Sequence, residues 1–354
     1  MFPNAVLMSD VIAGLKALPP RSVDILIGDP PYNIGKDFGG CKDRMALDAY
    51  VRWCMEWIDE GVRVLKPTGT FYIYGFSEIL AHLLVNATAE FNRWLVWHYT
   101  NKNAANATYW QRSHEAILVL AHQQPTFNVD LVREPYTDDF LKNTAGRKRS
   151  ATPGRFSDGL TETVYVAHAG GALPRDVLKH PTLAGSAGST ERARWCEDCD
   201  TLVIGLEEKR THAGHSLVDH PTQKPIALTR RLIAAAKNVG GETNVAVLFA
   251  GSGAECIAAQ EEGCNFIGFD IEPKYVRMAN AWIGRADSTQ VILAAAEATA
   301  PTVAPTVAEP TIPVADPNRR QGGGKPIAFP DDGIGRRHQH HEEFRSDRFD
   351  RWAA

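Results

Sequence analysis

Six short apolar runs alternate with helical patterns along the first 285 residues, and this alternation constrains the fold more than any other feature of the sequence. The runs are rich in β-branched and aromatic residues, which is typical of buried strands. Strands that alternate with helices predict a mostly parallel, doubly wound α/β sheet, which binds ligands at the carboxyl ends of its strands. The predicted strands cover residues 23–28, 70–74, 93–99, 116–121, 244–249 and 265–270, and the predicted helices cover 48–65, 224–241 and 254–264.

The composition divides the chain into three parts. Residues 134–215 hold few apolar runs and many Gly, Pro, Ser and Thr residues, which indicates a loop-rich insertion. After residue 285 the sequence is rich in Ala, Pro and Thr, and such a segment cannot bury enough apolar area to offset the entropy of ordering. We therefore predict an α/β domain built from residues 1–133 and 216–285, an inserted region at 134–215, and a low-complexity, disordered tail at 286–354.

Composition and charge exclude several classes of protein. The formal net charge is -4, so a nucleic-acid site must be a local basic patch. No run approaches the roughly 18 apolar residues of a membrane span, and the first residues lack the pattern of a signal peptide. Six cysteines in 354 residues do not suggest a disulfide scaffold. We expect a cytoplasmic, intracellular protein without a membrane partner.

A strand, a glycine turn and a helix follow one another in VAVLFAGSGAECIAAQ, residues 245–260. Gly251 and Gly253 allow the backbone to approach a ligand closely. Asp270 ends the next predicted strand about 20 residues later, where a carboxylate can accept hydrogen bonds from two ribose hydroxyls. Glu255 opens the helix, and an acid there disfavours a pyrophosphate. The pattern therefore favours a cationic or zwitterionic nucleoside, of which S-adenosylmethionine is one.

The strand at 23–28 runs into a stiff corner, DPPY at 29–32. Its prolines fix φ and remove N–H donors, so nearby carbonyls can point into a site. Asp29 and the Pro30 carbonyl offer two acceptors for an exocyclic amino group, and Tyr32 offers a ring for a flat base, worth roughly 1–3 kcal/mol. Such acceptors stabilise positive charge that develops on the amine. The corner is typical of direct methyl transfer to a nucleobase amino group; taken alone, it is equally compatible with a turn-capping Asp and a core Tyr.

Three motifs, DPPYNIG at 29–35, HPTQKPIAL at 220–228 and FAGSG at 249–253, resemble in this order the beta-class DNA amino-methyltransferases. The resemblance covers most of residues 1–285 and implies a circularly permuted Rossmann-like methyltransferase fold, in which the catalytic motif precedes the glycine motif. It also implies S-adenosylmethionine as cofactor, and double-stranded DNA from which the target base is flipped out. By this resemblance, residues 1–133 and 216–285 are the catalytic domain, and 134–215 is the target-recognition region.

The resemblance also implies roles for individual residues. The catalytic motif consists of Asp29, Pro30, Pro31 and Tyr32. The S-adenosylmethionine site consists of Asp10, an acid near the cofactor; His220, Thr222 and Lys224, near the methionine end; and Phe249, Ala250, Gly251, Gly253 and Asp270.

Asp29 favours adenine over cytosine as the target, because the family's N4-cytosine members usually carry Ser at this position. We therefore predict a site-specific DNA methyltransferase, of the kind found in restriction-modification systems, that acts on adenine N6. The N4-cytosine reaction stays open. So does a non-catalytic DNA-binding relative, which is suggested by departures from the family pattern at Val247, Leu248, Ala254 and Glu255. Methylation of RNA or protein amides is disfavoured, because those enzymes usually place the glycine motif first. The sequence decides neither a homodimer nor a restriction partner.

The insertion holds two further clusters. Cys196 and Cys199 form a C-x-x-C pair, His212 and His215 follow it, and two thiolates with two imidazoles are a sufficient tetrahedral set for a structural zinc. Zinc fingers usually have more residues between the histidines, so two ordinary cysteines with two solvated histidines are the alternative. A basic cluster is predicted to contact DNA phosphates, although a solvated face would look alike; it consists of Lys142, Arg147, Lys148, Arg149 and Arg155.

Overall fold

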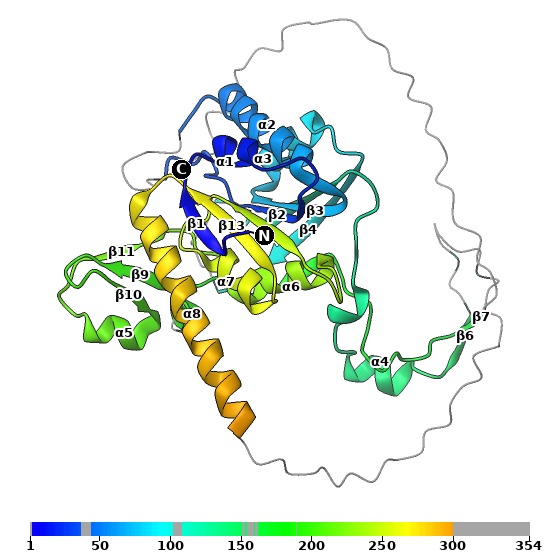
Figure 1. The fold of residues 1–354 in the computed structure, drawn as a ribbon. Coiled ribbons are helices and arrows are strands. Elements are labelled where there is room, and N and C mark those ends of the chain that lie inside the picture. Colours follow the sequence, from blue (N-terminus) through cyan, green and yellow to red (C-terminus); the bar gives the residue numbers. More distant parts are fainter. Residues whose placement is uncertain are drawn as a thin grey trace, which may run out of the picture. The chain divides into compact units, whose positions relative to one another are not determined.

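Eight strands form the central sheet, in the order β1-β13-β12-β2-β3-β5-β4-β8 (Figure 1). The computed structural model describes residues 2–36, 44–101, 108–150, 153, 159, 162–188 and 190–299. Among the strands described in this sheet, β5 alone runs against the others, so the predicted mostly parallel sheet is confirmed. The strands are β1 (Ala5–Met8), β2 (Val23–Gly28), β3 (Leu65–Gly75), β4 (Phe91–His98), β5 (His114–Ala121), β8 (Val177–Lys179), β12 (Asn244–Leu248) and β13 (Asn265–Asp270).

Helices cover both faces of this sheet, as a doubly wound fold requires (Figure 1). Leu26 of β2 packs with the helices of one face, and its neighbours Ile25 and Ile27 pack with those of the other. The apolar run at 25–27 in β2 is thus typical of a strand buried on both sides. One face carries α1 (Val11–Ala17), α2 (Leu47–Val64) and α3 (Ser77–Asn86), and the other carries α6 (Ile226–Ala236), α7 (Ala254–Glu261) and α8 (Pro273–Thr299).

The order of the chain along the sheet reverses between β12 and β2, and ligands bind at such switch points. The chain leaves β2 for β3 on one side and leaves β12 for β13 on the other. Leu248 and Gly28 face each other in register at the ends of the two strands. The N–H of Asp29 donates to the Leu248 carbonyl over 3.4 Å. The DPPY and FAGSG motifs therefore begin side by side, although they lie far apart in the sequence, and they follow the predicted permuted order.

The predicted insertion at 134–215 is not separate from the sheet. Within it β8 pairs with β4 at the edge of the central sheet, and Met1–Leu293 form one compact unit. A small second sheet has the order β10-β9-β11, and β11 lies beyond the predicted boundary at 215. The remaining elements of this region are α4 (Asp138–Asn143), β6 (Lys148–Ser150), β7 (Glu162–Val164), β9 (Ala193–Cys196), β10 (Thr201–Ile204), α5 (Gly205–Thr211) and β11 (Leu217–Asp219), with 3-10 helices at Val129–Leu131 and Gly185–Gly188.

The helix α8 runs past the predicted boundary at residue 285 and ends at Thr299. The segment AAAEAT at 294–299 explains this difference, because alanine and glutamate have high helix propensity. The predicted tail at 286–354 therefore begins inside a helix, and its remainder, 300–354, lies outside the described residues. Within the part of the chain that the structure describes, no helix is long and apolar enough to cross a membrane.

The six predicted strands and three predicted helices all overlap elements of the structure. The elements that were not predicted are mostly short strands and helices, such as β1, β8 and α5, in which too few residues exist to show a period. The helix predicted at 224–241 is shorter than expected, since it starts after Pro225 and ends at Ala236.

Candidate active site

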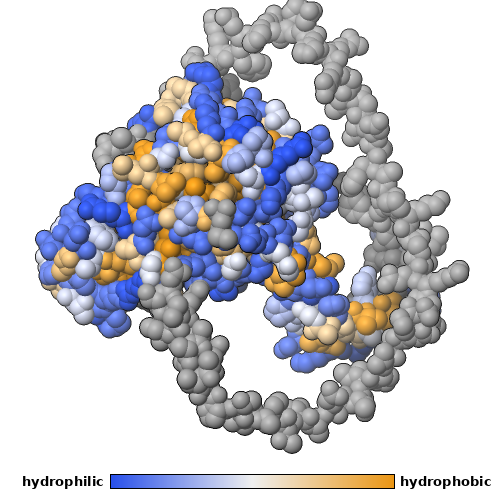
Figure 2. Space-filling model, viewed as in Figure 1, coloured by the Kyte–Doolittle hydropathy of each residue, from blue (hydrophilic) through white to orange (hydrophobic). Residues whose placement is uncertain are grey.

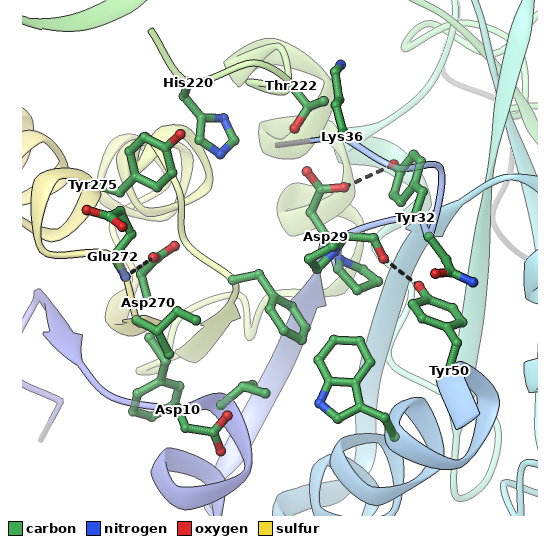
Figure 3. Close-up of a pocket in the computed structure, with 18 of the residues that line it drawn as sticks. Asp10, Asp29, Tyr32, Lys36, Tyr50, His220, Thr222, Asp270, Glu272 and Tyr275 are labelled. Carbon is green, nitrogen blue, oxygen red and sulfur yellow. Dashed lines mark hydrogen bonds between the residues drawn. The ribbon is translucent and has the colours of Figure 1, made fainter. Parts of the chain in front are cut away.

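A pocket of about 270 Å³ opens at the switch point between β12 and β2 (Figure 3). Asp29 and Tyr32 of the DPPY corner lie at one end of it, and Asp10, Asp270 and Glu272 lie at the other. The pocket thus joins the two predicted motifs in one cavity. Its walls between these ends include Trp53, His220, Thr222, Phe249 and Tyr275.

The end of the pocket opposite the corner is acidic. Asp10 caps α1 and accepts two N–H groups of its first turn, at 3.0 and 3.2 Å. Asp270, at the end of β13, accepts the N–H of Gly251 at 2.7 Å and that of Glu272 at 2.9 Å. Burial raises the pKa of Asp270 above its usual value. Both carboxylates have further lone pairs, so they can still accept hydrogen bonds from a ligand hydroxyl.

The mouth of the pocket is partly apolar. Ile271 lines the pocket just after β13, and Met8 ends the neighbouring strand β1, opposite Asp270. Both side chains are apolar, and each residue is 67% exposed. Figure 2 shows apolar residues gathered over this part of the molecule. An acidic end of the pocket beside apolar surface suits a ligand that combines a flat ring with hydroxyl or positively charged groups.

Phe249 forms the turn from β12 into the pocket. Its φ of 62° lies in the left-handed region that non-glycine residues rarely adopt. Its ring packs against Trp53 and Trp57 of α2, with centroid distances of 5.6 and 5.4 Å. Trp53 belongs to the predicted helix at 48–65, and in the structure it lines the pocket as well. The packing of three aromatic rings holds this strained turn in place.

The glycines behind Phe249 have separate tasks. A Cβ on Gly251 would lie 2.5 Å from Nε2 of His220, so glycine lets that ring reach the pocket wall. A Cβ on Gly253 would lie 2.7 Å from the Cβ of Ala279, so glycine there lets α7 pack closely on α8. Of the predicted cofactor residues in this turn, Phe249 lines the pocket, whereas Ala250 and the two glycines shape the turn behind it.

Gly251→Ala is expected to weaken binding of S-adenosylmethionine, the ligand predicted for this pocket, by at least roughly tenfold. The added methyl group forces the His220 ring out of its place, and the φ of 50° adds backbone strain. Isothermal titration measures the affinity. Gly240→Ala is the matched control, because Gly240 has a φ of 80° and no atom within 4 Å of its Cβ position. Equal affinity of the two variants would contradict the prediction.

The HPTQKP segment contributes His220 and Thr222 to the pocket lining. The His220 ring packs edge-on against Tyr275 of α8, with centroids 4.8 Å apart. Burial, together with the nearby charge of Lys224, lowers the pKa of His220 to about 3. The imidazole is therefore neutral at physiological pH and brings no positive charge to the pocket.

Asp29 forms a buried ion pair with Lys224. The Lys224 Nζ atom lies 2.6 Å from both carboxylate oxygens, and the two side chains are only 11% and 3% exposed. The hydroxyl of Tyr32 donates to Asp29 Oδ1 over 3.0 Å. Burial by itself would lower the pKa of Lys224, but the Asp29 and Glu115 carboxylates raise it. The ammonium therefore stays charged and holds the Asp29 carboxylate in one orientation.

Lys224 is joined to the catalytic corner. It is not among the residues that line the pocket, and its ammonium lies on the Asp29 carboxylate. The predicted place of Lys224 near the methionine end of the cofactor stays a prediction. An ammonium that is almost fully buried requires a counter-charge, and the Asp29 carboxylate supplies it. The structure thus connects the HPTQKP and DPPY motifs through one ion pair.

Two buried acids lie around this ion pair: Glu115, which sequence reasoning missed, and Glu255, which it noted only as an acid at the start of its helix. Glu115 of β5 accepts a hydrogen bond from the hydroxyl of Tyr99 at 3.4 Å. It also lies 3.1 Å from the hydroxyl of Tyr32, which shares its single hydrogen between Asp29 and Glu115. Glu255, in the first turn of α7, is 5% exposed; burial and the negative charge of Asp29 raise its pKa to about 8, so it is protonated at pH 7. The available signal for Glu115 was an acid directly before the predicted apolar strand at 116–121. Glu255 therefore belongs to the buried cluster and does not repel a ligand.

The residues of the predicted basic cluster have different surroundings. Lys142 lies in the last turn of α4, and Arg147 donates to its carbonyl at 3.0 Å. Lys148 of β6 forms an ion pair with Glu162 of β7. The side chain of Arg149 and the whole of Arg155 lie outside the described residues. Contact of this cluster with DNA stays a prediction.

The predicted metal ligands come together in the small second sheet. Cys196 ends β9 and Cys199 lies in the turn to β10, while His212 and His215 follow α5. One ligand atom from each residue lies within 4.8 Å of all the others. Sequence reasoning therefore selected four side chains that can hold one ion.

A comparison with families of known proteins shows to which family the chain belongs. The model of the DNA methylase family matches residues 23–281, which include the corner, the glycine turn and the HPTQKP segment. The chain belongs to the DNA methylase family. The protein is thus a DNA methyltransferase, and the family inferred from its motifs is confirmed.

Individual relatives of this DNA methylase agree with that assignment. The chain is 28% identical over 279 residues to the type II methyltransferase M.HpaI of Haemophilus parainfluenzae, covering 77% of this chain and 72% of the relative. It is also 28% identical over 279 residues to the DNA adenine methyltransferase YhdJ of Escherichia coli (strain K12), covering 78% and 81%. The solved PvuII DNA methyltransferase, which is cytosine-N4-specific, has a TM-score of 0.53 at 13% identity, covering 80% and 89%. The last comparison supports the fold alone.

Proposed function

We propose that this DNA methyltransferase uses S-adenosylmethionine and acts site-specifically on the N6 amino group of adenine. One observation carries the proposal: the buried corner of Asp29, Lys224 and Tyr32 opens onto the same pocket as the acids Asp10 and Asp270. One end of the pocket thus offers acceptors to an amino group, and the other offers acceptors to ribose hydroxyls.

S-adenosylmethionine fits the chemistry of the pocket. Asp10, Asp270 and Glu272 offer carboxylates to the ribose and to positive charge, and Phe249 and Trp53 offer aromatic walls to the adenine ring. The neutral His220 adds no positive charge beside these acids, which suits a cationic ligand. When bound, S-adenosylmethionine supplies an electrophilic methyl group on a positively charged sulfur.

The chain's own residues orient the target amine. Two bonds from Lys224 and one from Tyr32 use three of about four acceptor positions of the Asp29 carboxylate, so Asp29 can still accept an N–H of the base. The Pro30 carbonyl is the second acceptor, at the lining of the same pocket. The negative charge of Asp29 stabilises positive charge as it develops on the amino nitrogen. Tyr32 lines the pocket beside Asp29, so its ring is placed to contact the base.

Adenine is the proposed target because aspartate heads the corner and because a relative of similar length, YhdJ, is an adenine methyltransferase. The N4-cytosine reaction is the alternative within the same family. The fold does not distinguish them, since PvuII DNA methyltransferase is cytosine-N4-specific and shares it. A homodimer, a restriction partner and base flipping stay predictions for this chain, as does DNA contact by the cluster around Arg147.

Expression in a methylation-free host followed by modification-sensitive long-read sequencing tests this function. The expected result is N6-methyladenine in one sequence context, and no modified base with Asp29→Ala. N4-methylcytosine would replace the adenine assignment. Absence of any modified base, with the parent and Asp29→Ala behaving alike, would overturn the proposal that this chain acts as a methyltransferase of this kind.

We also propose that Cys196, Cys199, His212 and His215 hold a structural zinc ion. The Sγ atoms of Cys196 and Cys199 lie 3.4 and 3.1 Å from the Nδ1 atom of His215. The Nδ1 atom of His212 lies 2.8 Å from the Glu208 carbonyl, and a proton on that atom leaves Nε2 as the ligand nitrogen. Metal analysis of purified protein is expected to find about one zinc per chain, and none after Cys196→Ser with Cys199→Ser. Absence of zinc from the parent would end this proposal.

A further inference from the structure

The small sheet with its four metal ligands is joined directly to the active site. We call residues 193–219 the metal module; it contains β9, β10, α5 and β11. Its last strand, β11, ends at Asp219, and the next residue is His220 of the pocket wall. The segment from His220 to Lys224 therefore starts where the module ends.

The metal ligands sit where the three strands of the module meet. Cys196 is the last residue of the central strand β9, and it pairs with Thr201 of β10 on one side and with Leu217 of β11 on the other. His215 lies two residues before Leu217. An ion bound by Cys196 and His215 therefore ties β11 to the centre of the sheet at its first residue.

The spacing of the two histidines fits this site through a turn. His212 follows the last residue of α5, and the N–H of His215 donates to the His212 carbonyl over 3.1 Å. The two rings are perpendicular, with centroids 5.5 Å apart. A compact turn after the helix brings both imidazoles to one point with only two residues between them. The short spacing is therefore compatible with a tetrahedral site.

The module is also fastened to α8. Lys274 pairs with Glu197 over 2.7 Å, and Arg285 pairs with Glu208 over 3.0 Å. Tyr275, next to Lys274, is the residue whose ring packs on His220. The module is thus joined to His220 in two ways. Its strand β11 leads directly into His220, and its ion pairs fasten it to α8, whose Tyr275 packs against the His220 ring.

The carboxylates of the module serve mainly in ion pairs. Residues 193–219 hold six carboxylates and three Arg or Lys side chains. Five of the six carboxylates pair with Arg or Lys side chains, and the partners of Glu197, Asp200 and Glu208 lie on α8. These pairs hold the module against α8, so the module is placed for support of the active site.

We infer that the metal ion in this module positions the cofactor-binding segment of the enzyme. The inference deepens the proposed function, because it rests on the zinc site and on S-adenosylmethionine binding proposed above. A sheet with strands of three or four residues is marginal without a staple. Loss of the ion loosens β11, and with it His220 and Thr222 in the pocket and Lys224 on Asp29. Binding of the metal ion to the module therefore raises the affinity of the pocket for the cofactor.

The test compares two full-length variants. Cys199→Ser with His212→Ala removes two ligands, and Cys264→Ser with His82→Ala makes the same changes outside the cluster. The ligand variant is expected to lose zinc, to bind S-adenosylmethionine at least roughly tenfold more weakly, and to exchange the amide hydrogens of residues 217–224 faster, with those of β2 and β12 unchanged. The control is expected to match the parent in all three measurements.

A second measurement applies if the ligand variant does not fold. Zinc is removed from the folded parent with a chelator and then restored, and the affinity for S-adenosylmethionine is expected to fall and to recover. Zinc loss with unchanged affinity and unchanged exchange overturns the coupling. A parent without zinc overturns the metal site. A zinc-loaded parent that does not bind S-adenosylmethionine overturns the proposed cofactor instead, so the failures are distinguishable.

Discussion

Asp29→Ala is expected to slow methyl transfer by more than roughly 1,000-fold. In the proposed function it removes the carboxylate that accepts a hydrogen bond from the target amino group and stabilises the positive charge that develops on its nitrogen. Binding of S-adenosylmethionine is expected to change much less, since Asp10 and Asp270 stay in place at the other end of the pocket. Single-turnover transfer of labelled methyl groups to DNA measures the rate. Asp48→Ala is the matched control, because Asp48 is 69% exposed and pairs only on the surface with Arg52.

A second variant separates chemistry from folding in this experiment. Asp29→Ala leaves the Lys224 ammonium buried without its partner, which by itself destabilises the protein. Asp29→Ala combined with Lys224→Met removes both charges and is expected to recover most of the stability but none of the activity. Recovery of methyl transfer in the double variant would show that Asp29 acts through folding and would contradict its proposed role at the amine.

Lys224→Met is expected to lower the free energy of unfolding by about 3–5 kcal/mol at pH 7. The substitution keeps the length of the side chain but leaves the Asp29 carboxylate buried, with Glu115 nearby and no counter-charge. Urea denaturation followed by tryptophan fluorescence measures the change. Lys148→Met is the control, since the side chains of Lys148 and its partner Glu162 are 66% and 53% exposed, and we expect a loss of about 1 kcal/mol or less.

The destabilisation by Lys224→Met is expected to shrink as the pH falls. Burial already raises the pKa of Asp29 in the parent, and loss of Lys224 raises it further because that ammonium lowers it. A carboxyl group whose folded pKa lies above its unfolded value favours folding at low pH, and this contribution is lost as the pH rises through the folded pKa. A deficit that is constant from pH 4 to pH 8 would contradict the account of a buried, unpaired carboxylate.

Sequence reasoning predicted the central elements of the fold because their patterns are long and local. The runs at 23–28 and 265–270 coincide with β2 and β13, since both faces of these strands are buried and most of their positions are apolar or small. The edge elements β1 and β8 were missed, because strands of four and three residues carry no period. The boundary at 215 was placed inside the metal module, since nothing local indicates that β11 pairs with β9.

The candidate site was predictable where one short motif supplies both the residue and its surroundings. Phe249 lines the pocket because it directly follows β12, and Asp270 lines it because it is the last residue of β13. The place of Trp53 in the pocket was not predicted, since a helical pattern does not show that part of a buried face borders a cavity. Glu115 and Glu255 were missed as members of the site, because the hydrogen bond of Glu115 with Tyr32 and the electrostatic effect of Asp29 on Glu255 depend on other strands and helices.

The sequence by itself determined the central strands and helices, the motifs and the four side chains proposed as metal ligands, because these follow from local patterns of apolarity and residue type. Only the tertiary structure decided that Lys224 belongs to Asp29, across 195 residues of sequence. It also decided that His215 and His220 lie at the two ends of one short strand joined to the pocket. Burial explains the difference: a charge removed from water must find its partner wherever the fold brings one, and no local pattern records which partner that is.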